Sequence, residues 1–309
     1  MKFAMVFPGQ GSQAVGMLDV WAGNTAVADT LQQADAALGE DLSGLIANGP
    51  AENLNLTTNT QPAMLAASVA MLAAWRAAGG PPADLMAGHS LGEYAALTAA
   101  DAIDFADAIR LVRVRADAMQ AAVPVGTGAM AAILGLEDEA VLAVCEQASQ
   151  GEVVEGVNFN APSQVVIAGH KAAVERAMEK AKAAGAKRAV LLPVSAPFHA
   201  SLLKPAAAVL SSALSHIELR EPKTPVIHNV DVQMHREPSD IAQALVDQAW
   251  HPVRWVQTIE AMAQRGVTHV VECGPGKVLS GMVKRIDGSM TVLSVTDPVS
   301  MQAAIDALK

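Results

Sequence analysis

The feature that most constrains the fold is a serine between two glycines, at residues 88–92. Gly88-His89-Ser90-Leu91-Gly92 matches the pattern Gly-x-Ser-x-Gly, with a short apolar run before it and a helix-forming segment after it. In this context a sharp turn strains the serine backbone, and side chains at the glycine positions would clash. The turn would expose the hydroxyl at a helix N-terminus, where free N–H groups can stabilise an oxyanion. The pattern therefore predicts a nucleophilic Ser90, and the alternative is a glycine-rich turn with an incidental serine.

Around this turn the chain alternates between strand-like and helix-like segments. Before and after its middle part, this alternation favours an α/β domain with a largely parallel sheet. The expected strands are 3–7, 85–88, 225–230, 268–272 and 291–295, and the expected helices are 24–38, 62–78, 91–99, 105–121, 203–215, 239–249, 255–265 and 277–286. Pro62 is expected at the start of its helix, because proline fits the first helical turn.

The middle of the chain has a different order, strand-helix-strand-strand-helix-strand. The expected strands are 129–134, 153–159, 164–168 and 188–192, with helices at 138–149 and 172–184. This is the ferredoxin-like split βαβ arrangement, in a segment small enough to be an inserted domain. The sequence thus predicts a large α/β domain formed by residues 1–126 and 196–309, and a small domain formed by residues 127–195.

Charge is distributed unevenly along the chain. The net charge of −10 argues against nucleic acid as a partner. Residues 1–109 hold two bases against eleven acids, whereas the remaining 200 residues are almost neutral. Basic side chains that meet an anionic ligand would therefore come from the later part of the chain.

Several features point to a soluble protein of the cytoplasm. Cys145 and Cys273 have no motif spacing and suggest two buried thiols in a reducing compartment. The longest strongly apolar run, 63–75, is shorter than the ~20 residues of a membrane span. The apolar N-terminal run is too short for a signal peptide. We therefore expect no membrane association.

A nucleophilic serine needs a base, and His199 is the best of the eight histidines. It follows Pro193-Val194-Ser195-Ala196-Pro197-Phe198, a proline-stiffened loop at the return to the large domain. The alternative is a helix-capping histidine. The other histidines fit less well: His89 would point away from Ser90, His170 belongs to the small domain, and His216, His235 and His269 lie in polar surroundings. No acidic partner for His199 is evident, although Asp231 and Asp247 are weak candidates.

The segment Gly9-Gln10-Gly11-Ser12-Gln13-Ala14 resembles a dinucleotide-binding fingerprint after a strand. Asp29 lies at roughly the distance of a ribose-binding acid, but its segment has a helical composition, so that interpretation fails. A loop at the carboxyl edge of a strand suits a binding or oxyanion role for Gln10 instead.

Arg115 is expected on the apolar face of helix 105–121. It shares this face with Ala108, Val112 and Met119 at helical spacing. A buried guanidinium without a partner is very costly. The partner could be an internal carboxylate, or the side chain could extend outward to solvent. The third option is a substrate carboxylate bound by both arms of the guanidinium.

Six motifs in order along the chain closely resemble the malonyl-CoA:acyl-carrier-protein transacylases of bacterial type II fatty-acid synthesis. These motifs are Phe7-Pro8-Gly9-Gln10-Gly11-Ser12-Gln13, Gly88-His89-Ser90-Leu91-Gly92-Glu93-Tyr94, Asn158-Phe159-Asn160-Ala161-Pro162, Pro197-Phe198-His199, Asn229-Val230-Asp231 and Gly274-Pro275-Gly276. The resemblance covers essentially all 309 residues.

The resemblance implies an α/β-hydrolase-like large domain and an acyltransferase that works through a malonyl-serine. It implies Ser90 as nucleophile, His199 as base and the backbone N–H groups of Gln10 and Leu91 as oxyanion hole. Arg115 would bind the malonyl carboxylate. The backbone carbonyl of Gln248 would orient the histidine, in place of an acid. No metal and no resident cofactor are implied, since CoA and phosphopantetheine enter as substrates.

The implied partners are malonyl-CoA and an acyl carrier protein, and a monomer is the working hypothesis. Lys187-Arg188 and Lys284-Arg285 are candidates for carrier docking, against the simpler interpretation of solvated surface. The alternative functions are a malonyl transferase of a polyketide or malonate decarboxylase system, a serine esterase or thioesterase, and a non-catalytic acyl-binding component.

Overall fold

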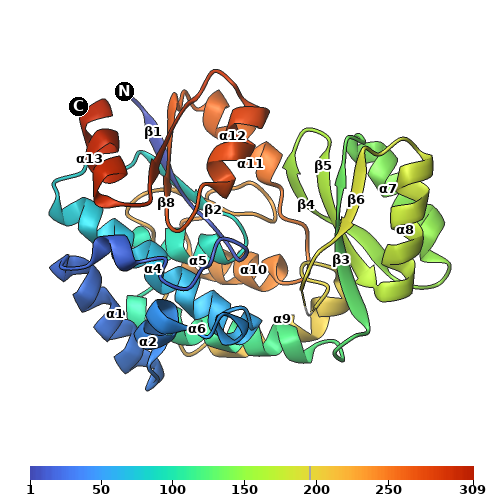
Figure 1. Cartoon of the computed structure of the whole chain (residues 1–309), viewed down its shortest axis with the longest axis horizontal. Helices are drawn as coiled ribbons and strands as arrows, with labels where there is room; N and C mark the ends of the chain where they lie inside the picture. Colours follow the sequence, from blue (N-terminus) through green and yellow to red (C-terminus); the bar gives the residue numbers. More distant parts are fainter. Residues whose placement is uncertain (195) are drawn as a thin grey trace.

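The computed structural model describes residues 1–194 and 196–309. Within these residues the strands form two separate sheets (Figure 1), one with the order β7-β2-β1-β8-β9 and one with the order β4-β5-β3-β6. The first sheet is made of β1 (Phe3–Phe7), β2 (Leu85–Gly88), β7 (Val226–Ile227), β8 (His269–Cys273) and β9 (Thr291–Val295). The second is made of β3 (Gly128–Leu134), β4 (Val154–Ala161), β5 (Gln164–His170) and β6 (Arg188–Leu191).

Helices cover both faces of the first sheet, whose strand pairs are all parallel. Along β1, Phe3, Met5 and Phe7 face one side and pack in the larger core, whereas Ala4 and Val6 face a second core on the other side. The helices of the larger core are α1 (Thr25–Leu38), α2 (Leu42–Asn48), α3 (Ala51–Leu54), α4 (Thr57–Ala77), α5 (Leu91–Ala99), α6 (Phe105–Ala121), α9 (Lys204–Leu214), α10 (Pro238–Gln248) and α13 (Pro298–Ala307). On the other side lie α11 (Trp255–Gln264) and α12 (Val278–Ile286). This two-faced burial explains the continuous apolar character of the strands.

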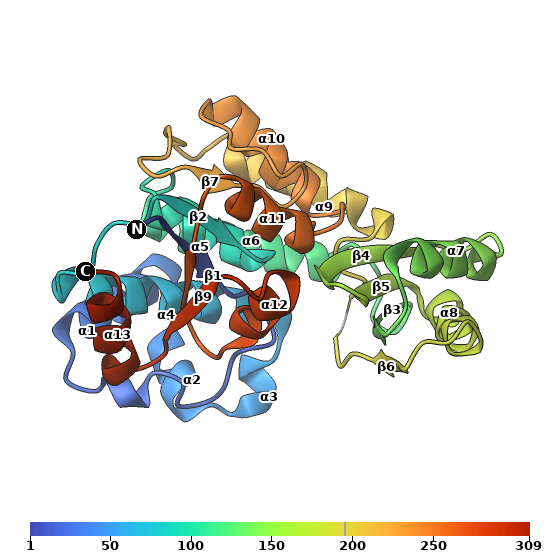
Figure 2. The ribbon, with the colours of Figure 1, turned by 90° about the horizontal axis from the view of Figure 1, so that it is seen from above.

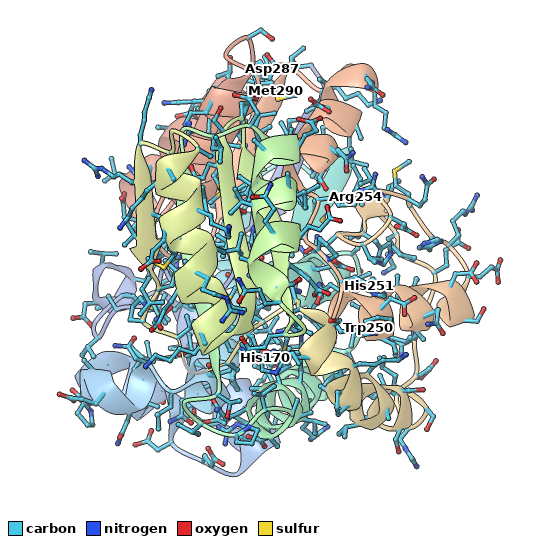
Figure 3. All side chains as sticks on the ribbon, turned by 90° about the vertical axis from the view of Figure 1, so that its right-hand side faces the viewer. His170, Trp250, His251, Arg254, Asp287 and Met290 are labelled. Carbon is cyan, nitrogen blue, oxygen red and sulfur yellow. The ribbon has the colours of Figure 1, made fainter. Side chains whose placement is uncertain are left out.

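The second sheet is antiparallel and lies beside the first, as Figures 1 and 2 show from two directions. Its strand order and connections are those of a ferredoxin-like βαββαβ unit, as predicted. Helices α7 (Asp138–Ser149) and α8 (Lys171–Ala183) pack on its outer face, toward the viewer in Figure 3. Its other face packs against α6 and the loop that carries Phe198. The predicted α/β class with a second, antiparallel sheet is therefore confirmed.

We propose that residues 1–126 and 196–309 form one domain and 127–195 the other, because the second range contains every strand of the antiparallel sheet. The boundary residue Ser195 lies outside the described residues. Within the described chain, no helix combines the length and apolar character that crossing a membrane would require.

Two predicted elements differ from the structure by more than two residues at one end. Helix α4 begins at Thr57, so that Pro62 lies inside it rather than at its start. The five preceding residues become helical because Thr57, Thr60 and Gln61 are buried against the rest of the protein. Strand β7 contains only Val226–Ile227, because the chain turns immediately afterwards: the N–H of Val232 donates to the carbonyl of His228.

Candidate active site

The turn between β2 and α5 holds Ser90 in the conformation that its glycines predict. Ser90 has φ 53° and ψ −111°, a strained combination for a residue with a side chain. A Cβ on Gly88 would lie 1.8 Å from the carbonyl oxygen of Gly92, and one on Gly92 would lie 2.0 Å from that of Phe7. Only glycine fits at either position. The side chain of Asn229 locks the turn, since its Oδ1 accepts the N–H of Ser90 at 2.7 Å and its Nδ2 donates to the carbonyl of Gly88 at 2.7 Å.

The hydroxyl of Ser90 contacts His199, the histidine that the sequence favours. Their Oγ and Nε2 atoms are 2.7 Å apart, and Nδ1 of His199 lies 2.8 Å from the backbone carbonyl of Gln248. A carbonyl can only accept, so the ring hydrogen is on Nδ1 and the Nε2 lone pair faces the hydroxyl. Burial, with the nearby charge of Arg115 as a further cause, lowers the pKa of His199 to about 3. The ring is therefore neutral and able to accept a proton.

The two acidic candidates for orienting His199 are both wrong. Asp231 instead lies 2.7 Å from Nε2 of His235, and Asp247 accepts from the side chain of Gln243 at 3.0 Å. Both carboxylates point to polar groups near the surface, whereas His199 is only 3% exposed. The carbonyl of Gln248 takes the place of an acid, which matches the residue that the resemblance implied.

The remaining histidines do not reach Ser90. His89 lies 2.7 Å from Oδ1 of Asn160 and packs on the ring of Trp255, and burial lowers its pKa. His170, labelled in Figure 3 on the antiparallel sheet, accepts the N–H of Val153 at 2.9 Å. His228, which sequence reasoning did not single out, belongs to a buried network with Glu93.

Arg115 is buried on the apolar face of α6, as predicted, and is only 1% exposed. Neither internal alternative holds, because the side chain does not reach solvent and makes no ion pair with a described carboxylate. Its Nη1 donates to Oε1 of Gln61 at 2.7 Å, and its Nη2 donates to Oε1 of Gln248 at 2.9 Å and to Oγ of Ser90 at 3.1 Å. Its Nε has no partner among the described residues. A buried cation held by neutral oxygens beside a serine hydroxyl is the arrangement of an anion-binding site.

Ser90, His199 and Arg115 line one cavity of about 610 Å³ between the two sheets. Gln10 and Leu91 line the same cavity. Leu91 is the first residue of α5, where a backbone N–H has no acceptor within the helix. The side chain of Gln10 donates to Oγ1 of Thr57 at 3.1 Å, which fixes its loop. Asp29 lies inside helix α1 and not at the end of a strand, so it is not placed as a ribose-binding acid would be. The dinucleotide-binding interpretation therefore does not apply.

Asn229 and Glu93 both belong to the sequence motifs, but sequence reasoning assigned no role to either of them. Asn229 locks the serine turn, and Glu93 is a fully buried carboxylate behind it. Burial could not be inferred for Glu93 from a single charged position on a short helix. The described residues contain no cluster of side chains suited to a metal ion.

Comparison with known proteins agrees with this geometry over the whole chain. The family model described as acyl transferase domain matches residues 4–297. Malonyl CoA-acyl carrier protein transacylase of Escherichia coli K12 is 54% identical over 306 residues, which cover 99% of either chain. The crystal structure of an acyl-carrier-protein S-malonyltransferase from Burkholderia pseudomallei is 59% identical with a TM-score of 0.98, covering 99% of this chain and 100% of that one.

A further solved structure contains a type II PKS acyl-carrier protein in complex with its malonyl-transacylase. The matched chain is 50% identical with a TM-score of 0.98, covering 99% of this chain and 100% of that one. The resemblance seen in the motifs therefore extends to the complete sequence and the complete fold. The chain belongs to the acyl transferase family and, within it, to the malonyl-CoA:acyl-carrier-protein transacylases.

Proposed function

We propose that this protein transfers a malonyl group from malonyl-CoA to the phosphopantetheine thiol of an acyl carrier protein in fatty-acid synthesis, through a malonyl ester of Ser90. The observation that carries the proposal is the buried Arg115 guanidinium, which has no carboxylate partner and reaches the same hydroxyl oxygen as His199. An acyl group with a terminal carboxylate supplies an anion that can pair directly with this guanidinium. The names of the relatives support the same substrates.

In the first half-reaction, Nε2 of His199 takes the proton of Ser90 while Oγ attacks the thioester carbonyl carbon. The backbone N–H groups of Gln10 and Leu91 stabilise the oxyanion. When the intermediate collapses, the carbon–sulfur bond breaks and CoA leaves with the proton from His199. The malonyl carboxylate stays on Arg115 throughout.

In the second half-reaction the thiol of the carrier protein replaces CoA. Its proton passes to Nε2 of His199 as the sulfur attacks the ester carbonyl carbon. The bond between that carbon and Oγ breaks, and His199 returns the proton to Ser90. This ping-pong sequence needs no metal and no resident cofactor.

The test is intact-mass and peptide mass spectrometry after mixing with malonyl-CoA. We expect one malonyl adduct on Ser90, which disappears when a holo carrier protein is added, with the malonyl group recovered on the carrier. Ser90→Ala is expected to form no adduct. An adduct that persists in Ser90→Ala would exclude Ser90 as the nucleophile. Release of free malonate in place of transfer would exclude the proposal and favour an esterase or thioesterase.

A second candidate concerns the carrier. The similarity to a transacylase solved with a type II PKS acyl-carrier protein favours a polyketide carrier as an alternative acceptor. Measuring kcat/KM with a fatty-acid carrier and a polyketide carrier side by side distinguishes the two.

Arg285 belongs to the candidate docking pair Lys284-Arg285. It donates to the carbonyl of Pro162 at 3.0 Å, so it lies at the junction of the two sheets.

We also propose that the protein acts in the cytoplasm as a monomer. Two buried free thiols support a reducing compartment. Burial raises the pKa of Cys145 to about 12, and it also raises the pKa of Cys273, so neither thiol is readily oxidised.

A further inference from the structure

Glu93 is a buried carboxylate to which the proposed reaction assigns no role. It lies on α5, one turn after Ser90, and is 0% exposed. Its Oε1 is 2.7 Å from Nδ1 of His228, and its Oε2 accepts from the N–H of Asn229 and from Nε2 of Gln248, both at 2.9 Å. Both oxygens thus accept from nitrogen donors, as an ionised carboxylate does. A buried charge of this kind needs a positive charge to balance it.

His228 is a poor source of that positive charge. Its ring is 0% exposed and its Nε2 has no hydrogen-bond partner among the described residues. A charged ring would bury an N–H without an acceptor, whereas a neutral ring with its hydrogen on Nδ1 leaves only a lone pair unpaired. The structure therefore favours a neutral His228 that donates to Glu93.

The side chain of Gln248 connects Glu93 to Arg115. Its Nε2 donates to Oε2 of Glu93 and to the carbonyl of Ser90, both at 2.9 Å, while its Oε1 accepts from Nη2 of Arg115 at 2.9 Å. A carboxylate only accepts and a guanidinium only donates, so the amide can bridge them in one orientation only. Hydrogen bonds in such a chain strengthen one another.

We propose that Glu93 is the indirect counter-ion of Arg115, paired with it through the Gln248 amide, and that it is thereby a positioning residue for the anion site. A direct ion pair would occupy the arms of the guanidinium. The indirect pair compensates the buried cation and leaves the Nη2 contact with Ser90 available to a substrate carboxylate. This inference rests on the proposed role of Arg115, but its test does not require malonyl transfer.

The test is a double-mutant cycle with Glu93→Gln, Arg115→Met and the double variant, read by urea unfolding. Each single change leaves one buried charge without its counterpart, and the double change removes both charges. We therefore expect the loss in unfolding midpoint of the double variant to be smaller than the sum of the two single losses. Additive losses would overturn the pairing. If Glu93→Gln does not fold, a folded double variant supports the pairing and an unfolded one overturns it.

The affinity for malonate provides a second measurement, which a purely structural role of Glu93 would leave unchanged. Without its counter-ion, the guanidinium is stabilised more strongly when an anion binds to it. Glu93→Gln is therefore expected to bind malonate about tenfold more tightly than the unmodified protein, as measured by calorimetry. Weaker or unchanged binding contradicts the proposal. The matched control is Glu272→Gln, a second fully buried carboxylate, which accepts the N–H groups of Leu279 and Ser280 on α12. It is expected to lower the unfolding midpoint and to leave malonate binding unchanged.

The two proposals fail in different ways. If the unmodified protein does not transfer malonyl groups but the cycle is non-additive, the proposed function fails and the counter-ion stands. If transfer occurs and the cycle is additive, Glu93 is only a structural part of the serine turn.

Discussion

Replacing Arg115 with methionine tests the central charge of the site. Methionine fills the buried space along α6 but removes the guanidinium donors to the malonyl carboxylate. In the structure Nη2 is shared between Gln248 and Ser90, and Nε has no partner. A malonyl carboxylate would use these donors. Breaking a buried charge pair on one side costs about 3–5 kcal/mol. At about 1.4 kcal/mol for each factor of ten, this corresponds to a loss of about 10² to 5 × 10³ in malonyl kcat/KM.

The assay is the rate of Ser90 acylation with malonyl-CoA and with acetyl-CoA, followed by intact-mass spectrometry. Acetyl-CoA has no carboxylate, so its rate at neutral pH is expected to change by less than about tenfold, because Ser90 and His199 are both retained. The preference for malonyl over acetyl should therefore collapse. The variant must also show an unchanged near-UV circular dichroism spectrum, so that a loss of folding is not read as a loss of selectivity.

The matched control is Arg110→Met, five residues earlier on the same helix and on its exposed face. The side chain of Arg110 is 54% exposed and pairs with Asp107, so its removal is expected to change neither rate. A variant of Arg115 that keeps the malonyl preference would refute the reasoning, because the carboxylate would then be recognised elsewhere.

Three further predictions concern the nucleophile, its base and the turn that holds them. His199→Ala is expected to slow acylation of Ser90 by about 10²–10⁴, measured by quenched-flow mass spectrometry, and an unchanged rate would remove His199 as the base. Because burial and the Arg115 charge hold the pKa of His199 at about 3, acetyl-CoA labelling should persist as the pH falls below the ordinary histidine range. Arg115→Met should move this acid limb to higher pH, whereas a limb near the ordinary value in both proteins would contradict the assignment. Gly92→Ala, whose Cβ would lie 2.0 Å from a backbone oxygen, should destabilise the protein by about 1–3 kcal/mol or more in urea unfolding. Gly281→Ala, with no atom within 4 Å of its Cβ, should stabilise the protein by about 0.5–1 kcal/mol, and equal effects would refute the steric argument.

Much of the fold follows from local signals in the sequence. The strand 85–88, the helix 91–99 and the helix 105–121 agree with the structure at both ends. Their ends are marked by glycine, by proline or by a change in apolar period, and these act within a few residues. Helix α13 was not predicted, although Asp297 and Ser300 form a capping box that the sequence alone could have revealed.

The start of α4 shows where local signals fail. Pro62 normally marks the beginning of a helix, but the preceding threonines and Gln61 become helical because they are buried. Likewise, the expected strand 225–230 is cut to two residues, since the chain turns to bring Asn229 against Ser90. Both differences arise from contacts between segments far apart in the sequence.

The sequence by itself determined the strained serine turn, the position of Arg115 on the apolar face of its helix and the two kinds of sheet, because each depends on residue type and spacing within one segment. Only the tertiary structure decided which groups face one another: His199 against Ser90, a backbone carbonyl in place of Asp231 or Asp247, and an amide between Glu93 and Arg115. The physical reason is that a hydrogen bond requires atoms to lie within about 3 Å at a suitable angle. No local pattern fixes that distance between residues that lie far apart in the sequence.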